Sequence, residues 1–197
     1  MPDNFLPKSS VSPPVIDAAL THWAAVGRRS TFPMAGRSLW PFLREGDQVT
    51  VVHGDYSHRP GTLIVYRHGD GLAVHRLLRA FTLHGEPVML LRGDNNARPD
   101  PPLHQERWVG RVVAIQRGDR IYNVDSPLWA GAGWLIAFLG RMTATLEGWA
   151  SAGRRRLFPG RALGAPGPLS RAIFLASRLP IRLITFVLWK IAPHARV

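Results

Sequence analysis

The sequence predicts a mainly β fold with a β-rich core over residues 31–125. Short runs with the alternating or continuous apolar pattern of strands recur through this region. Turn signals separate these runs, in a chain that contains 19 Gly and 17 Pro. Residues 1–30 are expected to form a leader and a short helix, and residues 126–197 a helical region.

The leader and helix come first. Residues 1–14 are polar and proline-rich, without the apolar stretch of a signal peptide, so we expect a flexible leader and no N-terminal membrane anchor. Residues 15–29 have helical spacing, with Ile16, Leu20 and Trp23 on one side and Gly27 as the stop. Seven strands are then expected, at residues 31–34, 48–53, 61–67, 72–78, 87–93, 109–116 and 120–124.

Two amphipathic helices are expected in the C-terminal region. In the first, Trp134, Phe138, Met142, Leu146 and Trp149 fall on one helical face. In the second, which starts near Leu169, three arginines align on one stripe and Pro180 predicts a kink. Those arginines are Arg171, Arg178 and Arg182.

The positive charge is concentrated in this helical region. Of the net charge of +12, residues 126–197 carry +9, with Glu147 as their one acid. No stretch reaches about 18 uninterrupted apolar residues, so a helix lying in a membrane surface is favoured over one that spans it. The alternative is a helical hairpin packed on its own core or on a partner. Nucleic-acid binding is not expected, because the helices are too apolar.

Three polar positions in the core carry possible chemistry. Ser38 lies in GRSLWP, His75 in GLAVHRLL, and Asp94 and Asp100 in LRGDNNARPD. A serine becomes a nucleophile when a histidine takes its proton, and a carboxylate then fixes the histidine tautomer. The chain has no cysteine, and its two lysines, Lys8 and Lys190, lie far from these motifs.

These motifs resemble the boxes of the signal peptidase I-like serine peptidases. The family's nucleophile box is similar to GRSLWPFLREGDQVTV, and its next two boxes are similar to GTLIVYR…GLAVHRLLRA. The family's Lys-Gly-Asp-Asn-Asn box is similar to LRGDNNARPD, and its closing strand is similar to VGRVVAI. The likeness covers about residues 30–118, in the family's order. It implies a coiled β-sheet core of the signal-peptidase and LexA-like repressor type.

The resemblance implies a serine endopeptidase that uses no cofactor or metal. Ser38 would be the nucleophile, His75 the general base, as in the endoplasmic-reticulum and archaeal members, and Asp100 the residue that orients His75; Asp94 is the alternative, or holds a turn. An extended peptide would bind beside residues 31–36 and 70–74, against Gly36, Leu39, Pro41 and Val74. The substrate would belong to a membrane-associated or exported protein.

Some positions depart from the family pattern, and other interpretations remain open. Leu39 replaces a methionine, Thr62 an aspartate and Arg92 a lysine. An idle peptide-binding member and a self-cleaving regulator are the alternatives to a protease. Gly46 and Asp47 are expected to build a turn. The remaining core histidines lack ligand spacing and are expected at the surface: His53, His58, His68, His84 and His104.

Overall fold

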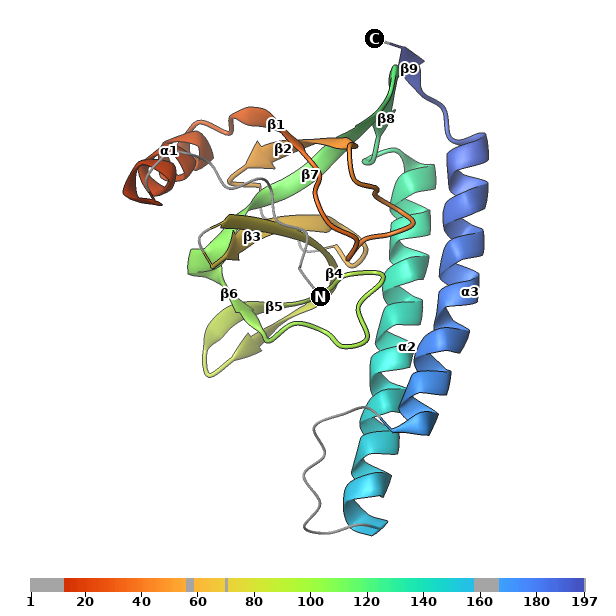
Figure 1. Ribbon diagram of the computed structural model, residues 1–197. Helices are drawn as coiled ribbons and strands as arrows, with labels where there is room; N and C mark the ends of the chain where they lie inside the picture. The colour runs from red at the N-terminus through yellow and green to blue at the C-terminus, as the bar shows by residue number, and fades with distance from the viewer. Residues whose placement is uncertain (1–12, 56–58, 70, 158–166, 197) are drawn as a thin grey trace.

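The computed structural model describes residues 13–55, 59–69, 71–157 and 167–196. Most of the predicted leader and His58 lie outside the described residues. Figure 1 shows a short helix, α1 (Pro13–Ala25), a curved antiparallel sheet, and two long helices side by side, α2 (Pro127–Leu157) and α3 (Pro168–Ile191). The predicted β-sheet and helices are present, but the fold is mixed α/β and not mainly β, because the two C-terminal helices are 31 and 24 residues long.

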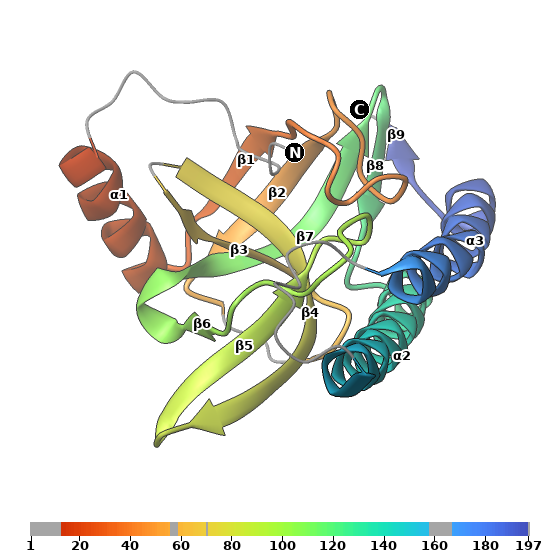
Figure 2. The ribbon, with the colours of Figure 1, turned by 60° about the horizontal axis from the view of Figure 1, so that its bottom comes forward.

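All seven predicted strands overlap observed strands. The sheet has the order β1-β2-β7-β3-β4-β5-β6, and β8 and β9 extend it beside β7 (Figure 2). The strands are β1 (Arg29–Pro33), β2 (Gln48–His53), β3 (Leu63–His68), β4 (Gly71–Leu83), β5 (Glu86–Arg92), β6 (Leu103–His104), β7 (Trp108–Arg117), β8 (Arg120–Asn123) and β9 (Ala195–Arg196), with a 3₁₀ turn η1 (Gln105–Arg107) before β7.

The sheet buries both of its faces at β3 and β4. Leu63 and Val65 of β3 belong to one core cluster, whereas Ile64 and Tyr66 belong to another. Successive side chains of a strand point to opposite faces, so each cluster covers one face. Residue 75 is on the face of the second cluster, and Arg76 is on the face that α2 covers.

α2 approaches the sheet through glycines. A Cβ at Gly61, which has a φ of +100°, would lie 2.4 Å from the backbone nitrogen of Trp134. A Cβ at Gly133 would lie 2.9 Å from the carbonyl oxygen of Gly61, and one at Gly140 would lie 3.0 Å from Leu78. Larger side chains would push the helix away from the sheet. This close contact fixes α2 against the strand that carries His75.

An aromatic cluster joins both long helices to the core. The ring of Trp129 in α2 packs edge-on against Phe42 and against Trp189 of α3, with centroids 5.3 and 5.0 Å apart. Tyr122 of β8 packs against both tryptophans. The Trp189 indole N–H also donates to the carbonyl of Phe42, at 3.2 Å. These contacts join α3 to the loop that follows Ser38.

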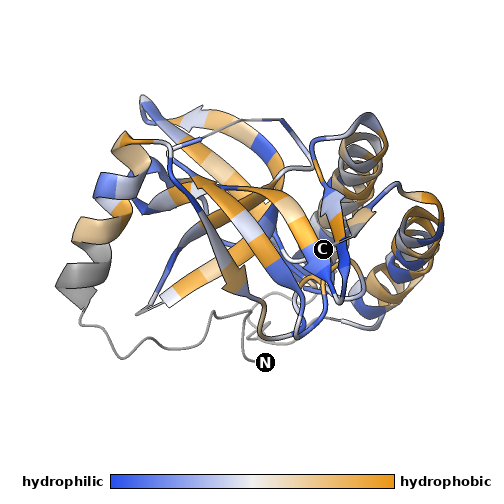
Figure 3. Cartoon of the chain, turned by 90° about the horizontal axis from the view of Figure 1, so that it is seen from above, coloured by the Kyte–Doolittle hydropathy of each residue, from blue (hydrophilic) through white to orange (hydrophobic). Residues whose placement is uncertain are grey.

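The apolar face predicted for α2 points outward. Trp134, Phe138 and Met142 are exposed, as are Leu146 and Trp149. The side facing the protein carries Ile136, Ala137, Thr143 and the two glycines above. Figure 3 shows hydrophobic residues along both C-terminal helices as well as on the strands.

α3 has the same arrangement. Its buried residues are Ser170, Ile181, Thr185 and Leu188. Its outer stripe is apolar and 59–69% exposed, and consists of Leu175, Leu179, Leu183, Phe186 and Ile191. By length and composition α3 is apolar enough to cross a membrane, with a mean hydropathy of 1.6, and it runs unbroken through Pro180.

Candidate active site

Ser38 lies in the turn between β1 and β2. The predicted Gly46–Asp47 turn is confirmed: Gly46 has a φ of +87°, and the Asp47 carboxylate accepts from the backbone N–H of Arg44 at 2.8 Å and from Arg117. On the other side, the backbone N–H of Asn95 donates to the Ser38 carbonyl at 2.7 Å. Ser38 is 5% exposed, so its hydroxyl is held at the edge of the core.

His75 occupies the middle of a buried strand. Its Nε2 atom lies 2.9 Å from the Ser38 hydroxyl oxygen. Its Nδ1 atom lies 2.5 Å from Asp100 Oδ2. An ionised carboxylate only accepts, so Nδ1 carries the proton and Nε2 accepts from Ser38. This is the geometry in which a histidine can take a proton from a serine.

The two candidate aspartates have separate partners. Asp94 accepts two hydrogen bonds from Arg76, at 2.8 and 2.7 Å, and this ion pair is almost fully buried. Because residues 75 and 76 point to opposite faces of β4, Asp94 lies on the face away from His75. The structure therefore brings Asp100 to His75 and gives Asp94 a structural contact.

Several contacts anchor the loop from Gly93 to Asp100. The backbone N–H of Asp100 donates to the Leu91 carbonyl at 2.9 Å. Gly93 lies so near the Ser38 carbonyl oxygen that a Cβ there would be 2.7 Å from it. The Arg178 guanidinium of α3 donates to the side-chain oxygen of Asn95. One loop thus links the serine, the aspartate and the C-terminal helix.

Tyr66 is a site residue that the sequence did not indicate. Its hydroxyl lies 3.0 Å from His75 Nδ1 and 3.2 Å from Asp100 Oδ2. Tyr66 faces Ala73 across the β3–β4 ladder, and Ile64 faces His75, so the tyrosine is the diagonal neighbour of His75. Only the strand register reveals this, because nothing in the sequence marks Tyr66 as different from the other β-type residues.

The four predicted substrate-contact residues differ in accessibility. Leu39 and Val74 are buried in the core, and Gly36 and Pro41 are partly exposed. A substrate could therefore meet the backbone at Leu39 and Val74 but not their side chains. Among the described residues, β1 pairs only with β2, and residues 71–75 pair only with β3, since pairing with β5 starts at Arg76. The parts of the two expected peptide-binding segments that lie in β1 and in β4 thus have an unpaired edge among the described residues.

The expectation of a surface position is wrong for His53, although His84 and His104 are exposed. His53 is 1% exposed, its Nε2 atom lies 2.5 Å from the Ser30 hydroxyl, and its ring packs against Trp23 and Phe32. It continues the buried alternation of Val49 and Val51. Burial, with a smaller contribution from Arg28, lowers the pKa of His53 below 6.5.

The predicted arginine stripe of α3 faces the site loops. Arg178 contacts Asn95, as described above, and the Arg182 guanidinium lies 4.8 Å from the ring centre of Trp40. Trp40 is two residues after Ser38 and is exposed. The stripe therefore packs partly on the neighbourhood of the candidate nucleophile.

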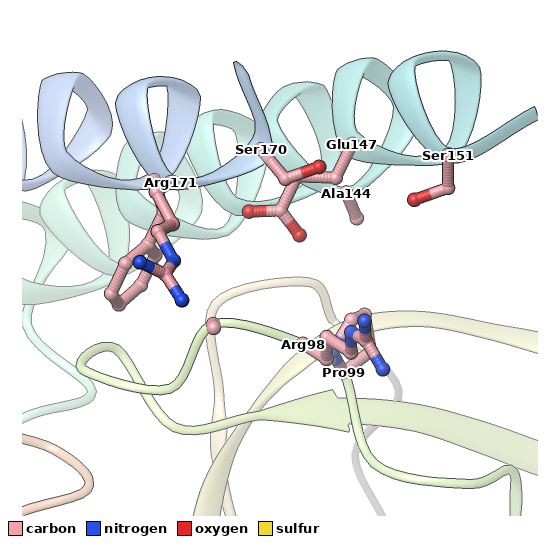
Figure 4. A pocket seen from close by; sticks show the side chains of 10 residues that line it. Arg98, Pro99, Ala144, Glu147, Ser151, Ser170 and Arg171 are labelled. Atoms are coloured by element: carbon pink, nitrogen blue, oxygen red, sulfur yellow. The ribbon is translucent and has the colours of Figure 1, made fainter. Parts of the chain in front are cut away.

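A cavity of about 300 Å³ lies between the loop before Asp100 and the helices. Figure 4 shows Glu147 and Ser170 of the helices opposite Arg98 and Pro99 of the loop. Burial raises the pKa of Glu147, and the charges of Arg92 and Arg98 oppose that shift. The cavity lining does not include Ser38 or His75, so this cavity lies beside the hydrogen-bonded triad and is not part of it.

Taken together, a serine, a histidine and an aspartate from three separate segments form one hydrogen-bonded chain, with a tyrosine beside it. This arrangement can activate a hydroxyl for attack on a carbonyl carbon. No protein-family model, curated protein or solved structure matches the chain.

Proposed function

We propose that this protein is a serine endopeptidase of the signal-peptidase type that hydrolyses an extended peptide segment. One observation carries the proposal: the Ser38 hydroxyl, His75 and the Asp100 carboxylate are hydrogen-bonded in sequence, at 2.9 and 2.5 Å. The likeness of the surrounding sequence boxes to that family supports the choice of a peptide bond as the substrate. The pairing of Asp94 with Arg76 supports Asp100 as the orienting carboxylate.

The reaction follows from the positions of the protons. Ser38 Oγ attacks the scissile carbonyl carbon while His75 Nε2 takes the hydroxyl proton. The resulting imidazolium is stabilised by Asp100 at Nδ1 and then gives its proton to the leaving amine. Backbone N–H groups of the turn, including that of Ser38, would hold the oxyanion. Water then attacks the acyl-enzyme, with His75 again as the base, and no cofactor is needed.

The unpaired strand edges support an extended substrate. The outer edge of β1 and residues 71–75 of β4 would add the peptide as a further strand. Since Leu39 and Val74 are buried, recognition at these positions would use main-chain hydrogen bonds. Small substrate side chains, which the family resemblance implies before the cut, would fit so close an approach.

The helical pair supports attachment to a membrane surface. Both helices turn apolar stripes outward, including Trp134 and Trp149 of α2 and Leu179 of α3. Arg154, Arg155 and Arg156 end α2, and such a cluster attracts anionic headgroups. We propose peripheral or monotopic binding, which would hold the site near membrane-associated or exported substrates.

The test uses the full chain on vesicles of anionic phospholipid. Wild-type protein is incubated with a library of extended peptides, and products are identified by mass spectrometry. Ser38→Ala should abolish cleavage, whereas Ser30→Ala, the matched serine beside His53, should retain it. Flotation of the protein with the vesicles measures membrane binding in the same samples.

The alternatives give different results. Peptide binding without cleavage by the wild type would favour an idle peptide-binding protein. Cleavage of the protein's own chain alone would favour a self-cleaving regulator. Equal cleavage by wild type and Ser38→Ala would overturn the proposed nucleophile. Failure to float would overturn membrane attachment but leave the peptidase proposal standing.

A further inference from the structure

Tyr66 is enclosed in the sheet next to the candidate base. It is 2% exposed and belongs to the core cluster that contains Ile64, Leu77 and Trp108. A hydroxyl in such apolar surroundings costs free energy unless it is hydrogen-bonded. The partners within reach include His75 Nδ1 and Asp100 Oδ2. The position of the hydroxyl thus depends on the same two groups that would carry the chemistry.

The donors and acceptors fix the direction of these contacts. Of the three contacts among Tyr66, His75 and Asp100, the one from His75 Nδ1–H to Asp100 is the shortest, at 2.5 Å. The Tyr66 O–H then donates to Asp100 Oδ2 at 3.2 Å, so one carboxylate oxygen accepts from both residues. Asp100 itself is 23% exposed and lies in a loop, so the tyrosine and histidine hold it from the buried side.

We propose that Tyr66 is a positioning residue, which holds the Asp100 carboxylate against His75 and partly neutralises its charge. This rests on the proposed function. The tyrosine touches no reacting atom of the substrate in the proposed reaction, and it acts through Asp100. Its ring and hydroxyl come from β3, so a rigid strand fixes the carboxylate of a loop residue.

The substitution Tyr66→Phe removes only the hydroxyl. Asp100 stays next to His75 through their own contact and through its backbone hydrogen bond to Leu91, but its carboxylate is less rigidly oriented. The carboxylate also lacks one donor, so its negative charge is less well compensated and it stabilises a protonated His75 more strongly. The acid limb of the pH–rate profile should move to higher pH. The value of kcat should fall about tenfold, the loss that corresponds to one hydrogen bond to a charged acceptor, with KM unchanged.

Other charged or titratable groups around Tyr66 stay the same in this variant. The guanidinium of Arg107 lies 5.9 Å from the tyrosine ring centre, and the His68 ring centre lies 6.1 Å away. Arg98 lies two residues before Asp100 in the loop. Because none of them is changed, a difference between wild type and Tyr66→Phe reports the hydroxyl.

The experiment has one readout that needs no substrate. Protein labelled with ¹⁵N-histidine is titrated by NMR in detergent micelles, with His75 assigned from a His75→Gln sample. Cleavage kinetics against pH are measured on the same variants. Tyr122→Phe is the matched control, because Tyr122 is also 2% exposed but packs against Trp129 and Trp189.

The expected result is a His75 titration that moves to higher pH in Tyr66→Phe but not in Tyr122→Phe. A His75 titration that is unchanged or moves to lower pH in Tyr66→Phe, or an equal shift in both variants, would overturn the inference. Absence of cleavage in the wild type, with the Tyr66→Phe shift present, would sink the proposed peptidase and leave the Tyr66–Asp100 contact supported.

Discussion

The described part of the chain contains two serine–histidine pairs with a buried histidine, and they differ in what contacts the second ring nitrogen of that histidine. The Ser30 hydroxyl oxygen on β1 lies 2.5 Å from His53 Nε2 on β2, and the Ser38 hydroxyl oxygen lies 2.9 Å from His75 Nε2. His75 Nδ1 contacts Asp100, but His53 Nδ1 is buried without a hydrogen-bond partner in the described part of the chain. Contact with a histidine therefore does not distinguish a nucleophile. The carboxylate on the second ring nitrogen is the feature that sets the proposed nucleophile apart.

The largest effect is expected when the Asp100 carboxylate is removed. Asp100→Asn should leave the fold intact but lower kcat by about 10⁴-fold, because the imidazole loses its preferred tautomer. Peptide cleavage and thermal unfolding are measured on the same preparation. A loss below tenfold would mean that Asp100 is not needed and that the two pairs are more alike than the geometry indicates.

A smaller effect, on stability, is expected at the other aspartate of the same loop, Asp94. Asp94→Ala leaves the Arg76 guanidinium, which is 1% exposed, without its carboxylate. This should cost about 3–5 kcal/mol of unfolding free energy. Urea unfolding in detergent measures the loss.

A matched double variant separates charge from packing. Arg76→Met with Asp94→Leu removes both buried charges and should recover much of the stability. If Asp94→Ala were fully stable yet inactive, Asp94 would have the orienting role and the assignment of the two aspartates would be reversed.

The smallest effect is expected at the second pair. Burial lowers the pKa of His53, so the unfolded chain binds a proton that the folded chain resists. Stability should be fully present above pH 6.5 and decrease as the pH falls through 6.5 toward the folded pKa. Unfolding free energy measured from pH 8 to 5 should show this decrease, and His53→Gln should lack it.

Activity provides the control for that prediction. Ser30→Ala should lower stability by about 1 kcal/mol, the value of one hydrogen bond, and leave cleavage unchanged. Loss of cleavage in Ser30→Ala would show that the first pair takes part in the reaction.

The sequence predicted the strands because they depend on local patterns, and it predicted the Ser38–His75 pair through the resemblance of the surrounding motifs to a peptidase family. Each expected strand had its own apolar run and turn signals. The resemblance favoured Asp100 over Asp94, and the structure places Asp100 at His75 and Asp94 at Arg76. Local patterns alone do not separate the two aspartates, since the choice depends on which face of β4 each end of the loop reaches. His53 could have been predicted as buried, because it continues the period of Val49 and Val51.

The helices were predicted in place, and for their orientation the sequence favoured a membrane surface but left packing on the core open. The large apolar residues of α2 were expected to form one face, and the structure turns that face outward. The sheet instead receives Gly133 and Gly140, because Arg76, Arg92 and Leu78 leave space only for small residues there. Amphipathic periodicity identifies an apolar and a polar face. It does not say whether the apolar face packs on the protein core or points outward, where a membrane could cover it.

The hydrogen bond from Arg178 to Asn95 has a consequence for how the protein can be divided. Asn95 also holds the backbone at Ser38, so removing the C-terminal helices would take away a support of the proposed nucleophile along with the exposed apolar surface of the helices. A soluble fragment ending at residue 125 would also lose the aromatic cover of Phe42 and Tyr122. Any domain that replaced the two C-terminal helices would therefore have to supply an arginine that contacts Asn95.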